Sequence, residues 1–291
     1  MTTQMEPRPL YWSIRRELWE NRSIYLAPLI VAAVVLFATS ISTLVIASRM
    51  RRLPAPNAAT QQAAISKPFS MAPAPIMFTA IVVGFLYCLD ALYGERRDRS
   101  ILFWKSLPVS DLTTVVSKAA IPLVVLPLIA LALSIVTQII LMQLGSVALI
   151  GTGMRASTSF RFFQGLPIMF YGLTIHELWF APIYAWILLI SAWARRAPVL
   201  WVVVPPLAIA GVERIAFNSW YFMNMLQYRM TGAMKEGFIL GPKGSHDGDI
   251  DRLSQLDPLR FLSAPGLWVG LAFAAACFAV AVRLRRNREP I

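Results

Sequence analysis

The stretch Gly94–Asp111, GERRDRSILFWKSLPVSD, decides how the rest of the chain is arranged. It opens with a run of charged residues at 95–99 and continues with an apolar patch at 101–104. Long apolar runs flank it at 75–93 and 119–142. A polar segment between two membrane spans must lie at one membrane face. We therefore expect a surface loop whose amphipathic part turns its apolar patch toward lipid or a partner's groove.

The composition is that of a membrane protein. Hydrophobic residues make up 57% of the 291-residue chain and charged residues only 14%, whereas a soluble domain carries about 25% charged residues. The formal net charge is +12. The basic residues are scattered between apolar runs and form no long stripe. We therefore expect loops that follow the positive-inside bias and touch anionic lipid, and no nucleic-acid partner.

Six apolar segments are candidates for membrane-spanning helices, which need about 20 residues each. They lie at 25–48, 75–93, 119–142, 168–194, 199–213 and 266–282. The fifth is short and contains Pro205-Pro206, so we expect it to be broken, and Pro122 and Pro127 are expected to kink the third. The predicted fold is an all-α integral membrane protein of six transmembrane helices.

The segments outside the spans divide the chain into three parts. Residues 1–24 form an N-terminal region, 25–283 the six-span domain and 284–291 a basic tail. Within the six-span domain, the charged loop covers 94–118, and the loops expected on the opposite side cover 49–74, 143–166 and 214–265. The aromatic first part of the last loop, 217–228, is a candidate for re-entry into the membrane.

The N-terminal region contains a predicted amphipathic helix over 9–22, with Pro9 suited to a helix start. Its apolar face consists of Leu10, Tyr11, Ile14 and Leu18, and its charged face of Arg15, Arg16, Glu17 and Glu20. Trp12 and Trp19 suit the headgroup level. We expect an interfacial helix parallel to the membrane; the alternative is a soluble helix packed on a partner.

An even number of spans places both termini on one side of the membrane. That side also holds the charged loop and the 195–198 turn, and its short segments are the denser in Lys and Arg. The positive-inside rule therefore makes it cytoplasmic. Arg49, Arg51 and Arg52, just outside the first span, do not fit this orientation.

The charged loop carries a family resemblance. Tyr93–Ser100, YGERRDRS, followed by Phe103–Pro108, FWKSLP, resembles the first cytoplasmic loop of ABC-2 type transporter permeases. In that family the loop holds a cytoplasmic coupling helix that docks on the ATP-hydrolysing subunit. The resemblance implies ATPase coupling through Glu95, Arg96, Arg99, Phe103, Trp104, Lys105, Leu107 and Pro108.

The same resemblance implies the assembly. Two permease chains, identical or paralogous, would pair with two ATP-binding subunits in a bacterial cytoplasmic (inner) membrane. The chain has no GxxxxGK[ST] motif, so we expect ATP and Mg on the partner ATPase, and no cofactor or enzymatic activity in this chain. The implied activity is export, with no substrate specified. The alternative is a membrane scaffold or sensor that binds an ATPase and moves nothing.

Four ionisable residues lie inside or at the ends of spans, where such groups are costly and commonly functional: Asp90, His176, Glu177 and Glu213. One hypothesis places them along an intramembrane polar path. The alternative, for Asp90 and Glu213, is local ion pairing with neighbouring arginines. His176 and Glu177, expected near the outer end of the fourth span, do not form an HExxH zinc motif, because Phe180 occupies the second histidine position. No metal site is expected.

Overall fold

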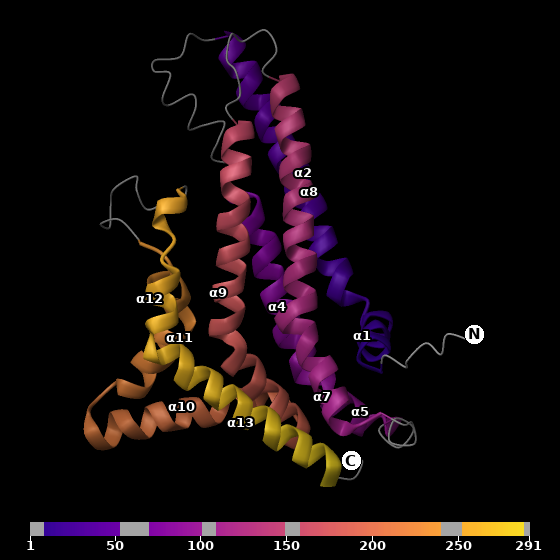
Figure 1. Cartoon of the computed structure of the whole chain (residues 1–291), viewed down its shortest axis with the longest axis vertical. Coiled ribbons are helices and arrows are strands. Elements are labelled where there is room, and N and C mark those ends of the chain that lie inside the picture. The colour runs from indigo at the N-terminus through magenta and orange to yellow at the C-terminus, as the bar shows by residue number, and fades with distance from the viewer. Residues whose placement is uncertain (1–8, 53–69, 101–108, 149–157, 240–251, 288–291) are drawn as a thin grey trace, which may run out of the picture.

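The computed structural model describes residues 9–52, 70–100, 109–148, 158–239 and 252–287. Over these ranges the chain is almost entirely helical and has no strand, apart from one isolated antiparallel bridge between Phe238 and Leu256. Figure 1 shows long helices standing side by side, with shorter ones around their lower end. The predicted all-α class is confirmed.

The described helices, in chain order, are α1 (Pro9–Glu20), α2 (Ser23–Arg52), α4 (Pro73–Ala91), α5 (Tyr93–Arg97), α7 (Asp111–Ala120), the π-helical turn η1 (Ile121–Val125), α8 (Leu126–Ala148), α9 (Thr158–Trp193), α10 (Pro198–Phe217), α11 (Tyr221–Gly237), the 3-10 turn η3 (Leu253–Gln255), α12 (Pro258–Ser263) and α13 (Pro265–Asn287). Six helical segments are long and apolar enough to cross a membrane. They are Ser23–Ile46, Pro73–Arg97, Asp111–Val147, Phe163–Trp193, Pro198–Phe217 and Pro265–Asn287. The chain is therefore a multi-pass membrane protein by helix length and composition, as predicted.

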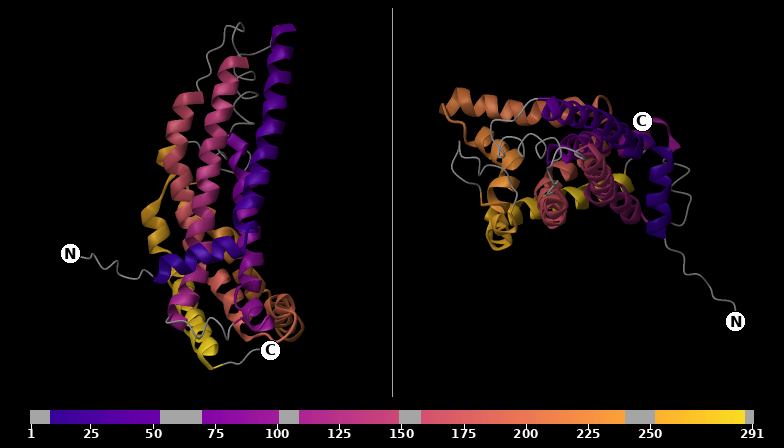
Figure 2. Two further views of the ribbon diagram at one scale, coloured as in Figure 1. Left: turned by 90° about the vertical axis from the view of Figure 1, so that its right-hand side faces the viewer. Right: turned by 90° about the horizontal axis from the view of Figure 1, so that it is seen from above.

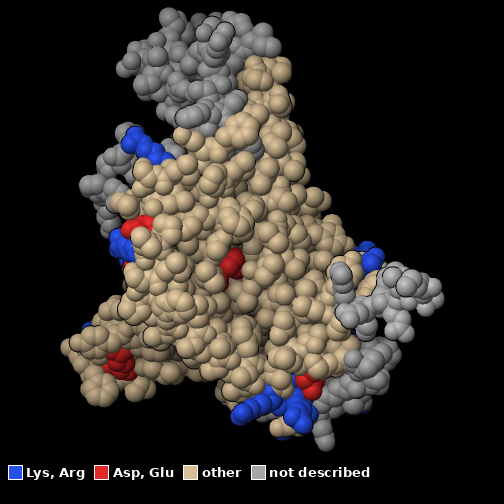
Figure 3. Space-filling view, viewed as in Figure 1, with Lys and Arg blue, Asp and Glu red and all other residues tan. Residues whose placement is uncertain are grey.

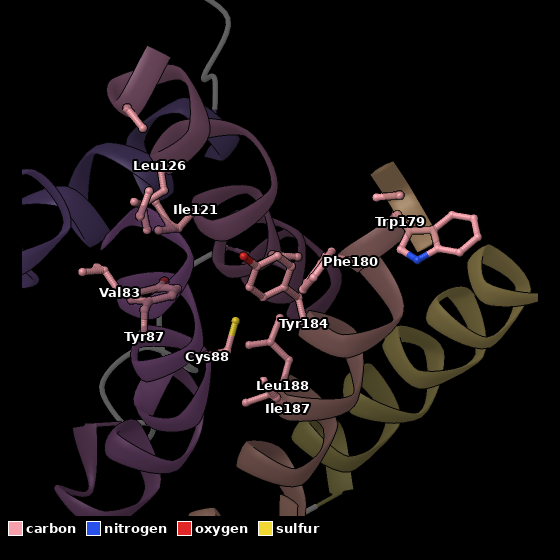
Figure 4. Close-up of a cluster of buried hydrophobic side chains, with 14 of the residues drawn as sticks. Val83, Tyr87, Cys88, Ile121, Leu126, Trp179, Phe180, Tyr184, Ile187 and Leu188 are labelled. Carbon is pink, nitrogen blue, oxygen red and sulfur yellow. The ribbon is translucent and has the colours of Figure 1, made fainter. Parts of the chain in front are cut away.

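The core lies where α4, η1, α8 and α9 meet. Figure 4 shows Tyr87 and Cys88 of α4 and Tyr184 of α9 among the apolar side chains that converge there. Gly84 allows this approach, because a Cβ on it would lie 3.3 Å from the Tyr184 ring and 3.4 Å from Pro122. Small residues bring membrane helices together in this way, since lipid supplies no hydrophobic drive for helix association.

Helix α10 is arranged differently from the other candidate spans. Figures 1 and 2 show it running across the lower end of the bundle, crosswise to α2, α8 and α9. It is continuous through Pro205 and Pro206, so the predicted break is wrong. Only 6% of its most apolar window is buried within the chain, as for α2. Their free faces are those that lipid or another chain would cover.

Several helix and loop boundaries in the structure differ from those predicted from the sequence. The charged loop expected over 94–118 is partly helical, because α5 covers Tyr93–Arg97 and α7 begins at Asp111. The third span is disturbed at Pro122, which lies in the π-helical turn η1. The last predicted loop contains α11, which packs along the middle of α9.

The predicted charged face of the N-terminal helix is also corrected. Glu17 of α1 is 1% exposed and faces the interior, although the sequence pattern placed it on the polar face. Helix α1 packs on α7, and Figure 2 shows it lying crosswise to α2. Its inward carboxylate is the first element of the site described next.

Candidate functional site

A cluster of charges, four of its six members buried, lies at the lower end of the bundle, where the charged loop leaves α5 and returns into α7. We call it the charge cluster; its members are Arg16, Glu17, Glu95, Asp111, Lys118 and Arg285. Three acidic and three basic side chains give the cluster a formal net charge of zero. Their pairings join parts of the chain that are far apart in the sequence.

Lys118 is the centre of the charge cluster. Its Nζ lies 2.9 Å from Oε1 of Glu17 and 3.1 Å from Oε1 of Glu95. Its side chain is 3% exposed. The ammonium therefore links α7 to α1 and α5 at once, in a place where water does not screen the attraction.

Glu17 is satisfied on both carboxylate oxygens. Besides Lys118, its Oε1 accepts from Arg16 at 2.8 Å, and its Oε2 accepts from the Tyr87 hydroxyl of α4 at 2.7 Å. Burial by itself raises the pKa of Glu17, but Lys118, Arg16 and Tyr87 together outweigh it and hold the pKa below its usual value. The carboxylate is thus kept charged inside the protein.

Glu95 and Arg285 join the loop to the end of α13. The Arg285 guanidinium contacts Oε2 of Glu95, and its Nε lies 3.2 Å from Asp111 at the start of α7. Arg16 of α1 reaches Glu95 at 3.4 Å. Both ends of the charged loop, α5 and α7, are therefore held by the same C-terminal arginine.

Arg96 turns away from the charge cluster and caps α9. Its guanidinium donates to the carbonyl of Ser191, at 3.2 Å, and to that of Ala194. Carbonyls at a helix C-terminus lack intrahelical partners and carry partial negative charge, so a buried arginine suits them. The Ser191 hydroxyl also accepts from the backbone N–H groups of Leu92 and Tyr93, which fixes the junction between α4 and α5.

The predicted coupling residues therefore divide into three groups. Glu95 and Arg96 are buried and make their contacts within the chain. Arg99 is exposed, with a left-handed backbone of φ 57°. Phe103, Trp104, Lys105, Leu107 and Pro108 lie outside the described residues. Their contact with an ATPase stays a prediction.

The far end of the loop is fixed by a helix cap. The Ser110 hydroxyl accepts from the backbone N–H of Thr113 at 3.1 Å, and Asp111 supplies an acidic first turn to α7. At the near end, Arg97 and Asp98 pair in the open at 2.9 Å. The loop thus begins and ends at defined points on the bundle.

The four residues of the predicted polar path do not come together. Asp90 lies 3.8 Å from Arg97 in an exposed pair, which confirms the local pairing considered for it. Glu213 caps α11 instead of pairing with Arg214: its carboxylate accepts from Ser219 Oγ and from the N–H groups of Tyr221 and Phe222 at 2.6 to 2.8 Å. Both residues have local structural roles.

His176 and Glu177 remain as a polar pair within the membrane. They lie near the middle of α9, not near its outer end, because α9 begins at Thr158. The His176 ring stacks on Phe180 with 4.1 Å between ring centroids. His176 Nε2 and Glu177 Oε2 are buried and have no hydrogen-bond partner in the described part of the chain. Polar atoms in this position are costly unless another group or water meets them.

Of the charge cluster, sequence reasoning found only Glu95 and missed the other five members: Arg16, Glu17, Asp111, Lys118 and Arg285. The available signal was the single lysine in the last turn before an apolar run, at a position that α7 buries. In the described ranges, no group of three or more His, Cys, Asp or Glu residues is placed to hold a metal ion. Comparison with protein-family models, with curated proteins and with solved structures finds no match to this chain.

Proposed function

We propose that this chain is the permease subunit of an ATP-driven ABC-2 type exporter in a bacterial cytoplasmic membrane, with both termini in the cytoplasm. Two copies, or one copy and a paralogue, form the translocation path, and two separate ATP-binding subunits supply the energy. The observation that carries the proposal is that both ends of the charged loop are anchored in the buried charge cluster.

An ATPase below the membrane needs a firm connection to the spans, because a loosely attached loop would absorb its motion. Here the charge cluster links α5, at the start of the loop, to α1, α7 and α13. Arg96 links the same turn to the end of α9. A displacement of residues 98–110 would therefore be shared by several spans, as mechanical coupling requires.

The unpaired polar pair at His176 and Glu177 supports a path over a passive scaffold. A scaffold has no use for a carboxyl group in the middle of a span, whereas a path that admits water or a polar cargo group supplies its missing partner. Helix α11 packs against the same helix, with the Trp179 indole donating to the Arg229 carbonyl at 2.9 Å. It would form one wall of such a path.

The first test is co-purification. The full chain is expressed with the ATP-binding protein encoded next to it, solubilised in mild detergent and captured by a tag on the permease. We expect the ATPase to be recovered with the wild type and lost with Trp104→Ala, while Trp201→Ala on the exposed face of α10 retains it. Failure to recover the ATPase with the wild type would remove the main support for the proposal.

The second test separates an exporter from a scaffold. Inverted vesicles containing the complex are given ATP, and accumulation of candidate lipid, peptide and drug cargoes is followed. If the complex hydrolyses ATP and none of these cargoes accumulates, the result would favour the alternative that the chain is a scaffold.

A further inference from the structure

An apolar groove lies between α7–η1 and α13, whose α7 and α13 residues also contribute to the charge cluster. It has a volume of about 690 Å³ and is lined almost wholly by apolar atoms. Leu112, Val116 and Val124 form one exposed wall, and Phe278 and Val282 belong to the other. Both walls belong to candidate spans, so the groove lies on a surface that lipid could cover.

The lining residues of the groove follow the helices lengthwise. From Leu112 to Val124 it follows one helical path for about 18 Å, and its floor is made of small side chains, Ala119, Ala120, Ala275 and Ala279. An apolar groove that runs along two candidate spans suits an acyl chain lying parallel to the helices.

One cation stands at the mouth of the groove. Arg283 lines the end of the groove toward the C-terminus of α13, which is the cytoplasmic end in the orientation proposed above; it is exposed and makes no ion pair among the residues that the structure describes. Its neighbour Arg285 is already committed to Glu95 and Asp111. Figure 3 shows basic side chains gathered at this lower end of the molecule.

We infer that this groove is a binding site for one anionic phospholipid of the cytoplasmic leaflet, with an acyl chain along α7 and α13 and the headgroup phosphate on Arg283. Charge decides between lipid and a second copy of the chain. An anionic headgroup would neutralise the exposed Arg283 at the mouth of the groove, whereas a two-fold pairing of two copies through this face would bring a second Arg283 toward the first.

The site has a consequence for the charge cluster. Leu112, Val115 and Ala119 lie on the same helix as Lys118 and Asp111, and Val282 and Arg283 directly precede the turn that holds Arg285. A lipid in the groove would hold α7 against α13 from the membrane side, opposite the ion pairs that hold them from within.

The test is native mass spectrometry of the purified full chain after delipidation, with phosphatidylglycerol or phosphatidylcholine of the same acyl chains added in equal amounts. We expect phosphatidylglycerol to be retained more strongly. Arg283→Gln should weaken its binding about fivefold, the effect of one basic residue near an anionic headgroup. Arg195→Gln, which removes an exposed charge from the α9–α10 turn, should leave it unchanged.

A second variant tests the apolar part. Ala279→Phe fills the groove from an exposed position and leaves Arg283 in place, so we expect the chain to fold and its retention of phosphatidylglycerol to fall. Equal binding of the two lipids, or wild-type retention by both variants, would overturn the inference. A dimer that dissociates in Ala279→Phe while lipid retention persists would show instead that the groove is an interface between copies.

Discussion

Replacing Lys118 by methionine removes the central charge of the cluster and keeps most of the side-chain volume. Two carboxylates, Glu17 and Glu95, lose an ammonium at 2.9 and 3.1 Å, and both are buried. Breaking a buried ion pair from one side costs about 3–5 kcal/mol, because the remaining charge stays in a low-dielectric site. Arg16 and Arg285 still contact these carboxylates, so we expect a loss near the lower end of that range.

The assay is unfolding in mixed micelles by SDS titration, followed by tryptophan fluorescence. The matched control is Lys235→Met on the exposed side of α11, which should change the free energy of unfolding by less than about 0.5 kcal/mol. Glu17→Gln combined with Lys118→Met should cost less than the two single changes added together, with a coupling of about 0.5–3 kcal/mol. Additive effects, or a Lys118→Met loss no larger than the control, would refute the argument that this ion pair holds the helices together.

Three further predictions concern acid stability, packing and the polar pair. The pKa of Glu17 is lower in the folded chain than in the unfolded chain. Its contribution to folding stability is therefore complete at pH values above the ordinary glutamate pKa, and it is lost as the pH falls through the folded-state pKa. The melting temperature should therefore fall as the pH is lowered from 7, and Glu17→Gln should make this fall smaller. Asp98→Asn, which removes a carboxylate from an exposed pair, should leave the fall unchanged. Gly232→Ala should destabilise the chain by about 1–3 kcal/mol, because the new Cβ would lie 2.4 Å from the Trp179 ring. The control is Gly211→Ala on α10, where a Cβ meets nothing within 4 Å and the stability should not change. Equal melting temperatures for the two variants would contradict the packing of α11 on α9. Glu177 Oε2 has no hydrogen-bond partner among the described residues, so Glu177→Gln should leave the melting temperature unchanged. If the proposed path exists, the same change should lower transport in vesicles, and unchanged transport would remove Glu177 from that path.

The spans and the N-terminal helix could be predicted because their signals are local. An apolar run of sufficient length indicates a span wherever its neighbours lie, and Pro9 marks the start of α1 in both sequence and structure. The π-helical turn also follows from a local cause, a proline within the third span. By contrast, Pro205 and Pro206 indicated a break that α10 does not have, which shows that proline alone does not decide continuity in a membrane helix.

The charge cluster could not be predicted because its pairings are long-range. Glu17 and Lys118 are 101 residues apart, and Glu95 and Arg285 are 190 residues apart. On α1 the charged residues repeat with helical period, and that pattern alone is typical of a solvated face. Only the packing of α1 on α7 shows that Glu17 points inward. His176 and Glu177 were placed too close to a helix end because the polar residues around 158–166 hid the true start of α9.

The position of the charge cluster suggests why buried charge is used here at all. A buried ion pair is often no more stabilising than apolar residues of the same size, so stability alone does not explain it. The buried ion pairs add an energetic penalty for partial separation: if α1, α7 or α13 moved away alone, a buried charge would lose its partner. Small rearrangements of apolar contacts carry no comparable penalty. Because these ion pairs join the helices, a displacement of α5 or α7 should be passed on to α1 and α13.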